Sequence, residues 1–329
     1  MPTISVVVPA YNAESTILKT ITSVQQQTFA DFELIIINDG STDGTLELLS
    51  TLEDSRLKIF SYENGGLSVA RNRGISQATG EFIAFLDADD LWTPDKLELQ
   101  LAALKQHPEA GVAYSWTHFM DEQGESFHAD QPIFFEGNVY PQLLVNNFLA
   151  SGSNPLIRKQ AIDIAGEFDP SVSGAADWDY WLRLSAHWHF VVVPKPQIFY
   201  RQSSSSMSSR VEFMEECQIN VIERAFKSAP KELQSLKSQS LSYIYQYSIK
   251  LCLARISGTE GAKQAVQKLI KAVRIYPKIL LDKKTQKLIV KLLLIWLLTP
   301  KIANYILQQI SKNRAVSIPV SKQDKAFIA

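Results

Sequence analysis

Three observations in the amino-acid sequence predict an α/β protein with a mostly parallel central sheet flanked by helices. Short apolar runs alternate with segments of helical spacing along the front of the chain. Polar or glycine-rich residues follow each of these apolar runs. Of the 329 residues, 46% are hydrophobic and 20% are charged, so the chain can bury a sizeable core.

The front of the chain repeats the order strand, loop and helix, which predicts parallel strands joined by right-handed crossovers. The predicted strands cover residues 3–8, 32–37, 57–61 and 82–86, and the predicted helices cover residues 15–27, 45–52, 67–77 and 94–106. The first of these helices shows helical spacing of Ile17, Leu18, Ile21 and Val24. Ser41 or Thr42 is expected to cap the second helix.

Polar residues stand at the carboxyl end of each predicted strand, and in a parallel sheet these ends lie along one edge. They are Tyr11 and Glu14, Asn38 and Asp39, Asn64 and Gly65, and Asp87 and Asp89. Four such loops together predict a nucleotide-sized pocket. Asp39 is expected to accept hydrogen bonds from a base there. The alternative is a turn aspartate, which an isolated Asn-Asp-Gly sequence favours.

Three carboxylates, Asp87, Asp89 and Asp90, follow the apolar run 82–86 within four residues. Such acids repel one another unless a cation lies between them. Mg²⁺ and Mn²⁺ prefer oxygen ligands and often take one or two carboxylates together with substrate phosphates. The sequence therefore predicts a metal–diphosphate site at this strand end. The alternative is that one acid caps the helix starting near Pro94 while the others are solvated.

Arg71 lies on the helix after the Gly65-Gly66 loop, and it is expected to neutralise a carboxylate or a diphosphate. The alternative is a surface ion pair. The chain has no Gly-x-Gly-x-x-Gly after its first strand and no Gly-x-x-x-x-Gly-Lys-Ser/Thr at any position. Both absences count against a dinucleotide-dependent oxidoreductase and a P-loop ATPase.

Charge is divided unevenly along the chain. Residues 1–209 hold 12 Lys and Arg against 26 Asp and Glu, whereas residues 210–329 hold 21 against 8. This split indicates an acidic, metal-using front and a basic back that can meet an anionic surface. The two cysteines, Cys217 and Cys252, are expected to be reduced thiols of a cytosolic protein.

The basic back half shows helical spacing. Helices are expected at residues 209–227, 231–254, 259–275, 284–298 and 300–312, with a loose tail at 316–329. The apolar run 288–298, flanked by Lys283, Lys284 and Lys287, resembles a helix lying on anionic lipid. The alternative is a buried bundle helix with a basic outer face. The run is too short to span a bilayer, which takes ~20 residues, and no signal peptide is expected.

Four segments of the front half resemble family 2 of the inverting glycosyltransferases, which have the GT-A fold. They are Val-Val-Val-Pro-Ala-Tyr-Asn-Ala-Glu at 6–14, Ile-Asn-Asp-Gly-Ser-Thr-Asp at 37–43, Ala-Arg-Asn-Arg-Gly at 70–74 and Leu-Asp-Ala-Asp-Asp at 86–90. The resemblance covers residues 3–205. It implies transfer of a sugar from a nucleoside diphosphate, expected to be UDP, to an acceptor hydroxyl with inversion, and Mn²⁺ or Mg²⁺ as cofactor.

The resemblance also assigns roles to single residues. Those expected to bind the nucleotide sugar are Pro9, Tyr11, Glu14, Asp39, Asn64, Arg71, Asp87 and Ala88. Asp87-Ala88-Asp89 would be the Asp-x-Asp motif of the family, in which Asp89 is the more direct metal ligand and Asp87 the second. The family often carries His where Ser203 stands, so the third protein ligand is in doubt, and water or phosphate oxygens would take its place.

An inverting transferase needs a base to take the proton of the acceptor hydroxyl, and a carboxylate beside that hydroxyl does this. Asp177 opens a predicted helix after small residues, and the family carries its base at this helix start. We therefore favour Asp177 over Asp179, the alternative being a plain N-cap aspartate. The family often has an acid at the position of Ala176. Trp178 and Trp181 are candidates for stacking on sugar rings, and Trp181 is the better candidate for the core.

The middle of the chain is expected to border the acceptor. Strands are predicted at 112–116, 156–158, 189–193 and 198–200, and residues 119–150 are expected to be irregular. Residues 151–154, Ser-Gly-Ser-Asn, would complete the acceptor border. The serine-rich run that begins at Ser203 is expected to be a loop that orders over the donor, or a linker.

The sequence thus predicts a catalytic domain at 1–205, with a nucleotide-sugar half at 1–110 and an acceptor half at 111–205, and a basic helical region at 206–315. Its expected partners are a nucleotide-sugar donor, a glycan or lipid-linked acceptor and an anionic membrane surface at the cytoplasmic face, but no nucleic acid. Surface polysaccharide or glycolipid assembly is the expected context. Two alternatives remain, a sugar-phosphate nucleotidyltransferase and a non-catalytic scaffold. The glycine-rich loop that a nucleotidyltransferase carries near its N-terminus is missing from this chain. The presence of Asp39, Asp87, Asp89 and Asp177 together argues against a scaffold that has lost its catalytic residues.

Overall fold

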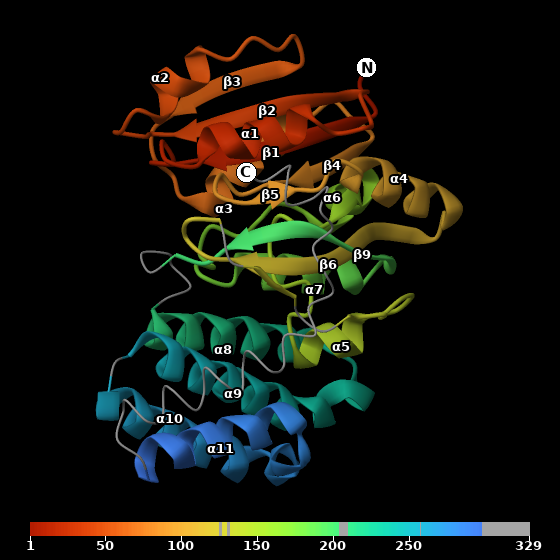
Figure 1. Ribbon diagram of the computed structural model, residues 1–329. Helices are drawn as coiled ribbons and strands as arrows, with labels where there is room; N and C mark the ends of the chain where they lie inside the picture. The colour runs from red at the N-terminus through yellow and green to blue at the C-terminus, as the bar shows by residue number, and fades with distance from the viewer. Residues whose placement is uncertain (125–126, 130–131, 204–209, 257, 298–329) are drawn as a thin grey trace. The chain divides into compact units, whose positions relative to one another are not determined.

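The computed structural model describes residues 1–124, 127–129, 132–203, 210–256 and 258–297 (Figure 1). Within these ranges the chain forms two compact units. The first holds residues 1–143 and 147–202, and the second holds residues 144–146 together with the described residues from 203 to 297.

The first unit is built on one nine-stranded sheet of described strands, in the order β3-β2-β1-β4-β8-β6-β9-β5, with β7 paired to β6. The strands are β1 (Ile4–Ala10), β2 (Phe32–Asp39), β3 (Leu57–Tyr62), β4 (Phe82–Phe85), β5 (Leu91–Trp92), β6 (Ala110–Met120), β7 (Phe127–Ala129), β8 (Leu156–Arg158) and β9 (His189–Arg201). Pairings among β1–β4 are parallel, as is β6 with β9, while β8, β7 and β5 pair antiparallel. The predicted α/β fold with a mostly parallel sheet is confirmed.

Seven described helices accompany these strands in the chain, and those that pack on the sheet bury its apolar strands. They are α1 (Ile17–Gln25), α2 (Thr45–Ser50), α3 (Leu67–Gln77), α4 (Lys96–Gln106), α5 (Tyr140–Val145), α6 (Lys159–Ala165) and α7 (Ala176–Ser185). Every residue of β1 and β2 is buried, because a central parallel strand has helices on both of its faces. One core cluster joins these strands to α1 and α4, where Ile21 and Leu101 are among the buried side chains. Of the four apolar residues with helical spacing on α1, Ile17, Ile21 and Val24 are buried and Leu18 is 37% exposed.

Two local predictions about loops are also wrong. Asp43, and not Ser41 or Thr42, bonds the start of α2, where its Oδ1 accepts the backbone N–H of Thr45 at 3.0 Å. Ser41 and Thr42 instead contact Asn12, whose backbone N–H donates to the Ser41 hydroxyl and whose Oδ1 accepts the Thr42 N–H. Ser41 and Thr42 thus bond the loop after β1 and do not cap α2.

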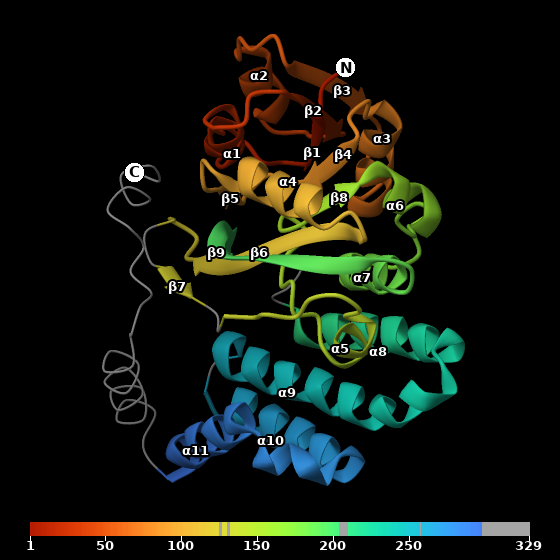
Figure 2. The same ribbon diagram turned by 90° about the vertical axis from the view of Figure 1, so that its right-hand side faces the viewer.

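The two predicted closing strands, 189–193 and 198–200, form one continuous strand, β9. Its pairing with β6 jumps from Val193 opposite Ser115 to Pro196 opposite Trp116, so two residues bulge out between these pairs. One of the bulged residues is Pro194, which has no N–H for a sheet bond and is therefore tolerated at a bulge. Pairing with β9 also extends β6 to Met120 (Figure 2). The region 119–150, predicted to be irregular, also contains β7 and a helix at Tyr140–Val145, so that prediction is wrong over these residues.

The second unit is helical. Its elements are α8 (Val211–Ser228), the 3₁₀ turn η2 (Lys231–Leu236), α9 (Lys237–Arg255), α10 (Gly258–Ile275), η3 (Pro277–Leu281) and α11 (Lys283–Leu297). Figures 1 and 2 show α8, α9, α10 and α11 side by side in chain order. Residues such as Ile249, Ala265 and Leu292 fill a core between them. The predicted helix 300–312 and the tail 316–329 lie outside the described residues. None of the described helices is long and apolar enough to cross a membrane.

Candidate active site

The candidate site is built where the parallel strands of the first unit end. Ala10 pairs with Asn38, and Val7 pairs with Phe85, so β1, β2 and β4 finish along one edge of the sheet. Tyr11 follows β1, Asp39 is the last residue of β2, and Asp87 follows β4. Adjacent strands lie about 4.8 Å apart, so the loops after them can serve one small ligand.

The loops after β1 and β2 are bonded to each other. Asn12, with a φ of 49°, accepts the Thr42 N–H on its Oδ1 at 2.8 Å, and Glu14 accepts the Gly44 N–H on its Oε2 at 2.8 Å. This arrangement leaves Tyr11 with 53% of its surface exposed. Pro9 is buried within β1. Of the residues predicted to hold the nucleoside, Tyr11 therefore offers a free side-chain surface, whereas Pro9 shapes the strand beneath it.

Asp39 is 2% exposed, and its carboxylate holds the loop after β3. Its Oδ2 accepts the Gly66 N–H at 2.8 Å, and its Oδ1 accepts the Gly65 N–H at 3.0 Å and Arg73 Nη1 at 2.7 Å. Gly66 has a φ of +84°, which favours glycine. Asn64 donates to the backbone carbonyl of Asp39 at 2.9 Å. A carboxylate has about four acceptor positions, and these three donors occupy most of them.

Arg71 and Asp87 form an ion pair that is buried on the arginine side. Arg71 Nη2 lies 2.7 Å from Asp87 Oδ1, and the two side chains are 2% and 24% exposed. The Nε atom of Arg71 is buried and has no hydrogen-bond partner among the described residues. Gly152 permits this placement, because a Cβ atom there would stand 2.3 Å from Arg71 Nη2. Arg71 therefore holds unused donor capacity beside a partly exposed carboxylate.

Of the three clustered acids, Asp90 is structural. It is fully buried, and its carboxylate accepts the hydroxyl of Ser153 at 2.6 Å, the hydroxyl of Ser151 at 3.2 Å and the N–H of Arg201 at 2.9 Å. Burial raises the pKa of Asp90 well above its ordinary value. The N-cap residue of α4 is Asp95, and Asp90 bonds Ser151, Ser153 and Arg201, so the alternative in which one of the three acids caps this helix is wrong.

Asp89 is partly buried, and burial together with the neighbouring charge of Asp87 raises its pKa to about 6. Between these acids, the carbonyl oxygen of Ala88 accepts the hydroxyls of Thr16 and Thr20, each at 2.9 Å, and fixes the turn. Two partly exposed carboxylates with like charges are an oxygen donor set that suits Mg²⁺ or Mn²⁺. Among the residues that the structure describes, no group of three His, Cys, Asp or Glu side chains could hold a metal ion. Substrate phosphates and water would have to supply the remaining ligands.

Asp177 lies in the first turn of α7 and belongs to the same charged cluster. Burial raises its pKa, the positive charge of Arg71 lowers it, and the negative charge of Asp87 raises it. Its Oδ1 accepts the Trp178 N–H at 2.8 Å, and its Oδ2 accepts Asn147 Nδ2 at 3.1 Å. Asp179, the other candidate base, is buried and paired with Arg183 at 2.9 Å. Asp177 thus interacts electrostatically with Arg71 and Asp87, whereas Asp179 is paired with Arg183.

The segment 147–154 contacts Asp177, Arg71 and Asp87, and the sequence motifs did not predict these individual contacts. Asn147 bonds Asp177, Gly152 lies against Arg71, and the Ser153 hydroxyl accepts the Asp87 N–H at 3.0 Å. The run of small polar residues at 151–154 was the available sequence signal. Trp178 and Trp181 are 3% and 0% exposed, so neither presents a ring to a sugar.

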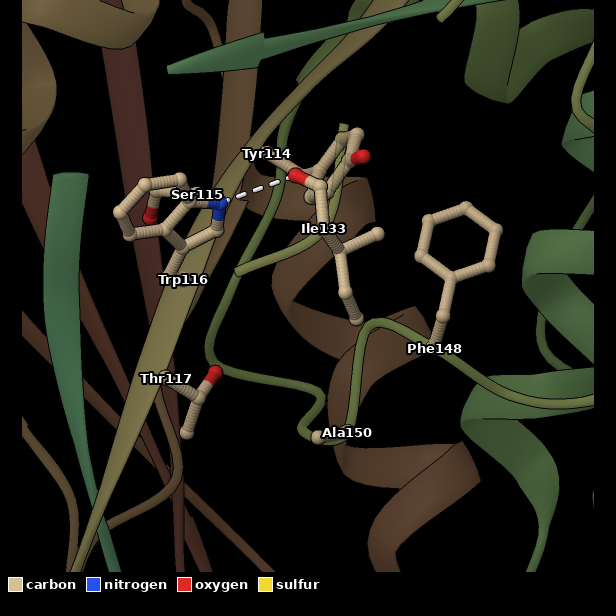
Figure 3. Close-up of a pocket in the computed structure, with 7 residues that line it drawn as sticks. All are labelled: Tyr114, Ser115, Trp116, Thr117, Ile133, Phe148 and Ala150. Carbon is tan, nitrogen blue, oxygen red and sulfur yellow. Dashed lines mark hydrogen bonds between the residues drawn. The ribbon is translucent and has the colours of Figure 1, made fainter. Parts of the chain in front are cut away.

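A pocket opens beside this segment (Figure 3). Its lining residues are Tyr114, Ser115, Trp116, Thr117, Ile133, Phe148 and Ala150. Trp116 Nε1 donates to the Ile133 carbonyl at 2.9 Å, and the Tyr114 hydroxyl donates to the Phe135 carbonyl at 2.8 Å. These bonds hold Phe134 and Phe135 in place with 65% and 42% of their surfaces exposed. An aromatic surface therefore lies next to the segment that contacts Asp177.

A family model and individual relatives both identify this chain as similar to glycosyltransferases. The family described as "Glycosyltransferase like family 2" matches residues 5–250. The teichuronic acid biosynthesis glycosyltransferase TuaG of Bacillus subtilis is 35% identical over 187 residues, which are 56% of this chain and 72% of that protein. An uncharacterized glycosyltransferase of Rickettsia felis is 40% identical over 144 residues, 43% of this chain but 23% of its own length. The chain thus spans about a quarter of that relative.

Solved structures show the same fold at lower identity. TarS 1-349 of S. aureus, in complex with UDP-GlcNAc, is 22% identical, with a TM-score of 0.61 over 84% of this chain and 82% of that chain. The mannosyltransferase PcManGT of Pyrobaculum calidifontis, in complex with GDP-Man and Mn²⁺, is 17% identical, with a TM-score of 0.57 over 86% of this chain and 88% of that chain. From the family match, the sheet order and these neighbours together, the chain belongs to glycosyltransferase family 2 and has the GT-A fold.

Proposed function

We propose that this protein is a metal-dependent, inverting glycosyltransferase that moves a sugar from a nucleoside diphosphate, with UDP as the favoured nucleotide, to a hydroxyl of a glycan or lipid-linked acceptor. The observation that carries the proposal is the cluster of Asp87, Arg71 and Asp177. Arg71 pairs with Asp87, and both charges act on Asp177, which supports a site where Arg71 would bind the diphosphate and Asp177 would be the base.

The donor side of the proposal rests on the loops after β1, β2 and β3. Tyr11 presents an exposed ring, and Asp39 holds the Gly65-Gly66 loop beneath the site. Asn64 and Glu14 fix the neighbouring loops through the Asp39 carbonyl and the Gly44 N–H. The solved relatives with bound UDP-GlcNAc or GDP-Man support a nucleotide sugar as the ligand.

The metal part rests on Asp87 and Asp89. Asp89 would be the direct ligand and Asp87 the second, with the donor diphosphate and water as further ligands. A bound Mn²⁺ or Mg²⁺ would offset the negative charge of the departing nucleoside diphosphate. Arg71 would offset the same negative charge, because Asp87 holds its guanidinium at the site and its Nε has no partner in the described part of the chain.

Asp177 would act as the general base. Its carboxylate takes the proton of the acceptor hydroxyl while that oxygen forms a bond to the anomeric carbon and the bond from that carbon to the diphosphate breaks. The carboxylate must be ionised for this step. Arg71, the Trp178 N–H and Asn147 favour the ionised form, against burial and the charge of Asp87.

The test compares Asp177→Asn with the unaltered protein. A panel of nucleotide sugars with and without Mn²⁺, screened by thermal shift, first identifies the donor. The variant is expected to keep donor binding in calorimetry while its transfer rate falls by at least about a hundredfold. Asp163→Asn, an exposed position on α6, is the matched control. Full turnover by Asp177→Asn would remove Asp177 as the base, and no response to any nucleotide sugar would remove the donor class.

We further propose that the second unit, which begins near residue 203, binds an anionic membrane surface through α11. Exposed apolar side chains gather at its carboxyl end, with Val290, Leu293, Trp296 and Leu297 between 53% and 77% exposed. Lys283, Lys284 and Lys287 are exposed at its start. Basic residues next to exposed apolar ones favour the surface of anionic lipid.

Vesicle sedimentation tests this second proposal. Binding to vesicles with about 30% phosphatidylserine is expected to exceed binding to neutral vesicles, and to weaken as salt screens the lysines. The double variant Trp296→Ser, Leu297→Ser is expected to lose binding. Equal sedimentation with both kinds of vesicle would count against the proposal. Such binding would place the enzyme at the cytoplasmic face, in surface polysaccharide or glycolipid assembly.

A further inference from the structure

Asn147 contacts the candidate base directly. Its Nδ2 donates to Asp177 Oδ2 at 3.1 Å, while the Trp178 backbone N–H donates to Oδ1 at 2.8 Å. Each carboxylate oxygen therefore has a donor, and both rotation and sideways movement of the carboxylate are restricted. The charged groups that face Asp177 are Arg71 on α3 and Asp87 after β4.

Packing does not explain an asparagine at this position. Its other amide atom, Oδ1, is buried and has no hydrogen-bond partner among the described residues. A buried acceptor without a partner is unfavourable for folding, and an apolar side chain of similar size would avoid that penalty. What the asparagine supplies in return is the N–H that reaches Asp177.

We propose that Asn147 is a positioning residue, which holds the carboxylate of Asp177 ionised and aimed at the acceptor hydroxyl. This inference rests on the proposed role of Asp177 as the base. A donor to a carboxylate favours its ionised form and so lowers its pKa. A base that is rotated away from its hydroxyl also loses rate, because proton transfer needs hydrogen-bond reach.

The experiment uses the full chain and the donor identified by the thermal-shift screen. Asn147→Leu removes both the donor and the unpartnered acceptor, and Asn147→Asp keeps the shape but replaces the donor with a second carboxylate. Asn146→Leu makes the same change at the exposed neighbouring asparagine and is the matched control. The readouts are the melting temperature, kcat, the donor KM and the pH profile of kcat/KM.

For Asn147→Leu we expect a melting temperature within a few degrees of the unaltered protein, because loss of the donor to Asp177 offsets removal of the buried acceptor, together with an unchanged donor KM and a kcat lowered by about tenfold to a hundredfold. The acid limb of kcat/KM should move up by about one pH unit, because the ionised carboxylate has lost its donor. Asn147→Asp should move that limb further in the same direction, since it adds a like charge.

The outcomes separate this inference from the function it rests on. If the unaltered protein transfers sugar and both variants keep its pH profile and kcat, Asn147 has no positioning role, although the enzyme assignment stands. If Asn147→Leu lowers the melting temperature sharply and Asn147→Asp restores kcat, the residue is structural and the inference fails. If the unaltered protein transfers no sugar, the proposed function fails and the inference fails with it.

Discussion

A methyl group at position 152 should disable the arginine of the candidate site without touching any charged residue. The Cβ atom of an alanine there would stand 2.3 Å from Arg71 Nη2 and 3.0 Å from its Cζ. Ordinary contact between such atoms is about 3.5 Å, so the guanidinium must move by about 1 Å. Arg71 is 2% exposed and bonds Asp87 at 2.7 Å, so this movement breaks or lengthens the ion pair.

The size of the effect follows from these contacts. An extra carbon in a well-packed site costs about 1–3 kcal/mol, and a strained ion pair that is buried on one side places the value for Gly152→Ala in the upper half of that range. Displacement of Arg71 should also weaken nucleotide-sugar binding by about tenfold, or about 1.4 kcal/mol. Denaturant unfolding measures the first quantity, and calorimetry with the donor and Mn²⁺ measures the second.

Gly111→Ala is the matched control. A Cβ atom there would stand 2.7 Å from the ring of Trp188, so this substitution also overpacks a buried position, but on β6 and away from Arg71. It should lower stability to a similar extent and leave donor binding unchanged. If Gly152→Ala bound the donor as tightly as the unaltered protein, Arg71 would have no part in holding the diphosphate.

Three further predictions concern the carboxylates. Because the pKa of Asp89 is raised to about 6, and a metal ligand must be deprotonated, Mn²⁺ binding should weaken as the pH falls through 6, and Asp89→Ala should abolish the metal-dependent part of donor binding in calorimetry. Glu33 is 4% exposed with its pKa lowered to about 2 from 4.5. It should therefore contribute about 3 kcal/mol to the free energy of unfolding above pH 4.5, and this contribution should disappear as the pH falls to 2. In the variant Glu33→Gln, the free energy of unfolding should depend less on pH over that range. Asp39→Asn turns an N–H toward the donors of Gly66 and Arg73, and it should cost about 1–3 kcal/mol in denaturant unfolding.

The strand ends were predictable because they depend on residues that are close in the sequence. Apolar runs bounded by turn residues predicted β1, β2, β3 and β4 to within a few residues, and their order implied that Asp39 and Asp87 share an edge. The choice of Asp177 over Asp179 came from the family resemblance, and it stays a prediction; the structure adds that Asp179 is paired with Arg183.

Other features depend on contacts between distant parts of the chain. Asp90 looked like a third metal candidate until the structure buried it against Ser153, 63 residues away, and against the N–H of Arg201, 111 residues away. Asp39 has the sequence context of a turn aspartate, yet its carboxylate oxygens accept hydrogen bonds from Arg73 and from the loop after β3. Asn147 carried no local signal at all.

The sequence by itself determined the helices and strands of the first unit, the loops that follow its parallel strands and the acids in and beside those loops. Hydrophobic periodicity and turn chemistry act over short stretches of chain, so they can be read from the sequence. The tertiary structure alone decided which of those acids are satisfied by the protein and which remain for a ligand. Burial and hydrogen bonding between residues tens of positions apart make that distinction, as the contrast between Asp90 and the partly exposed Asp87 shows.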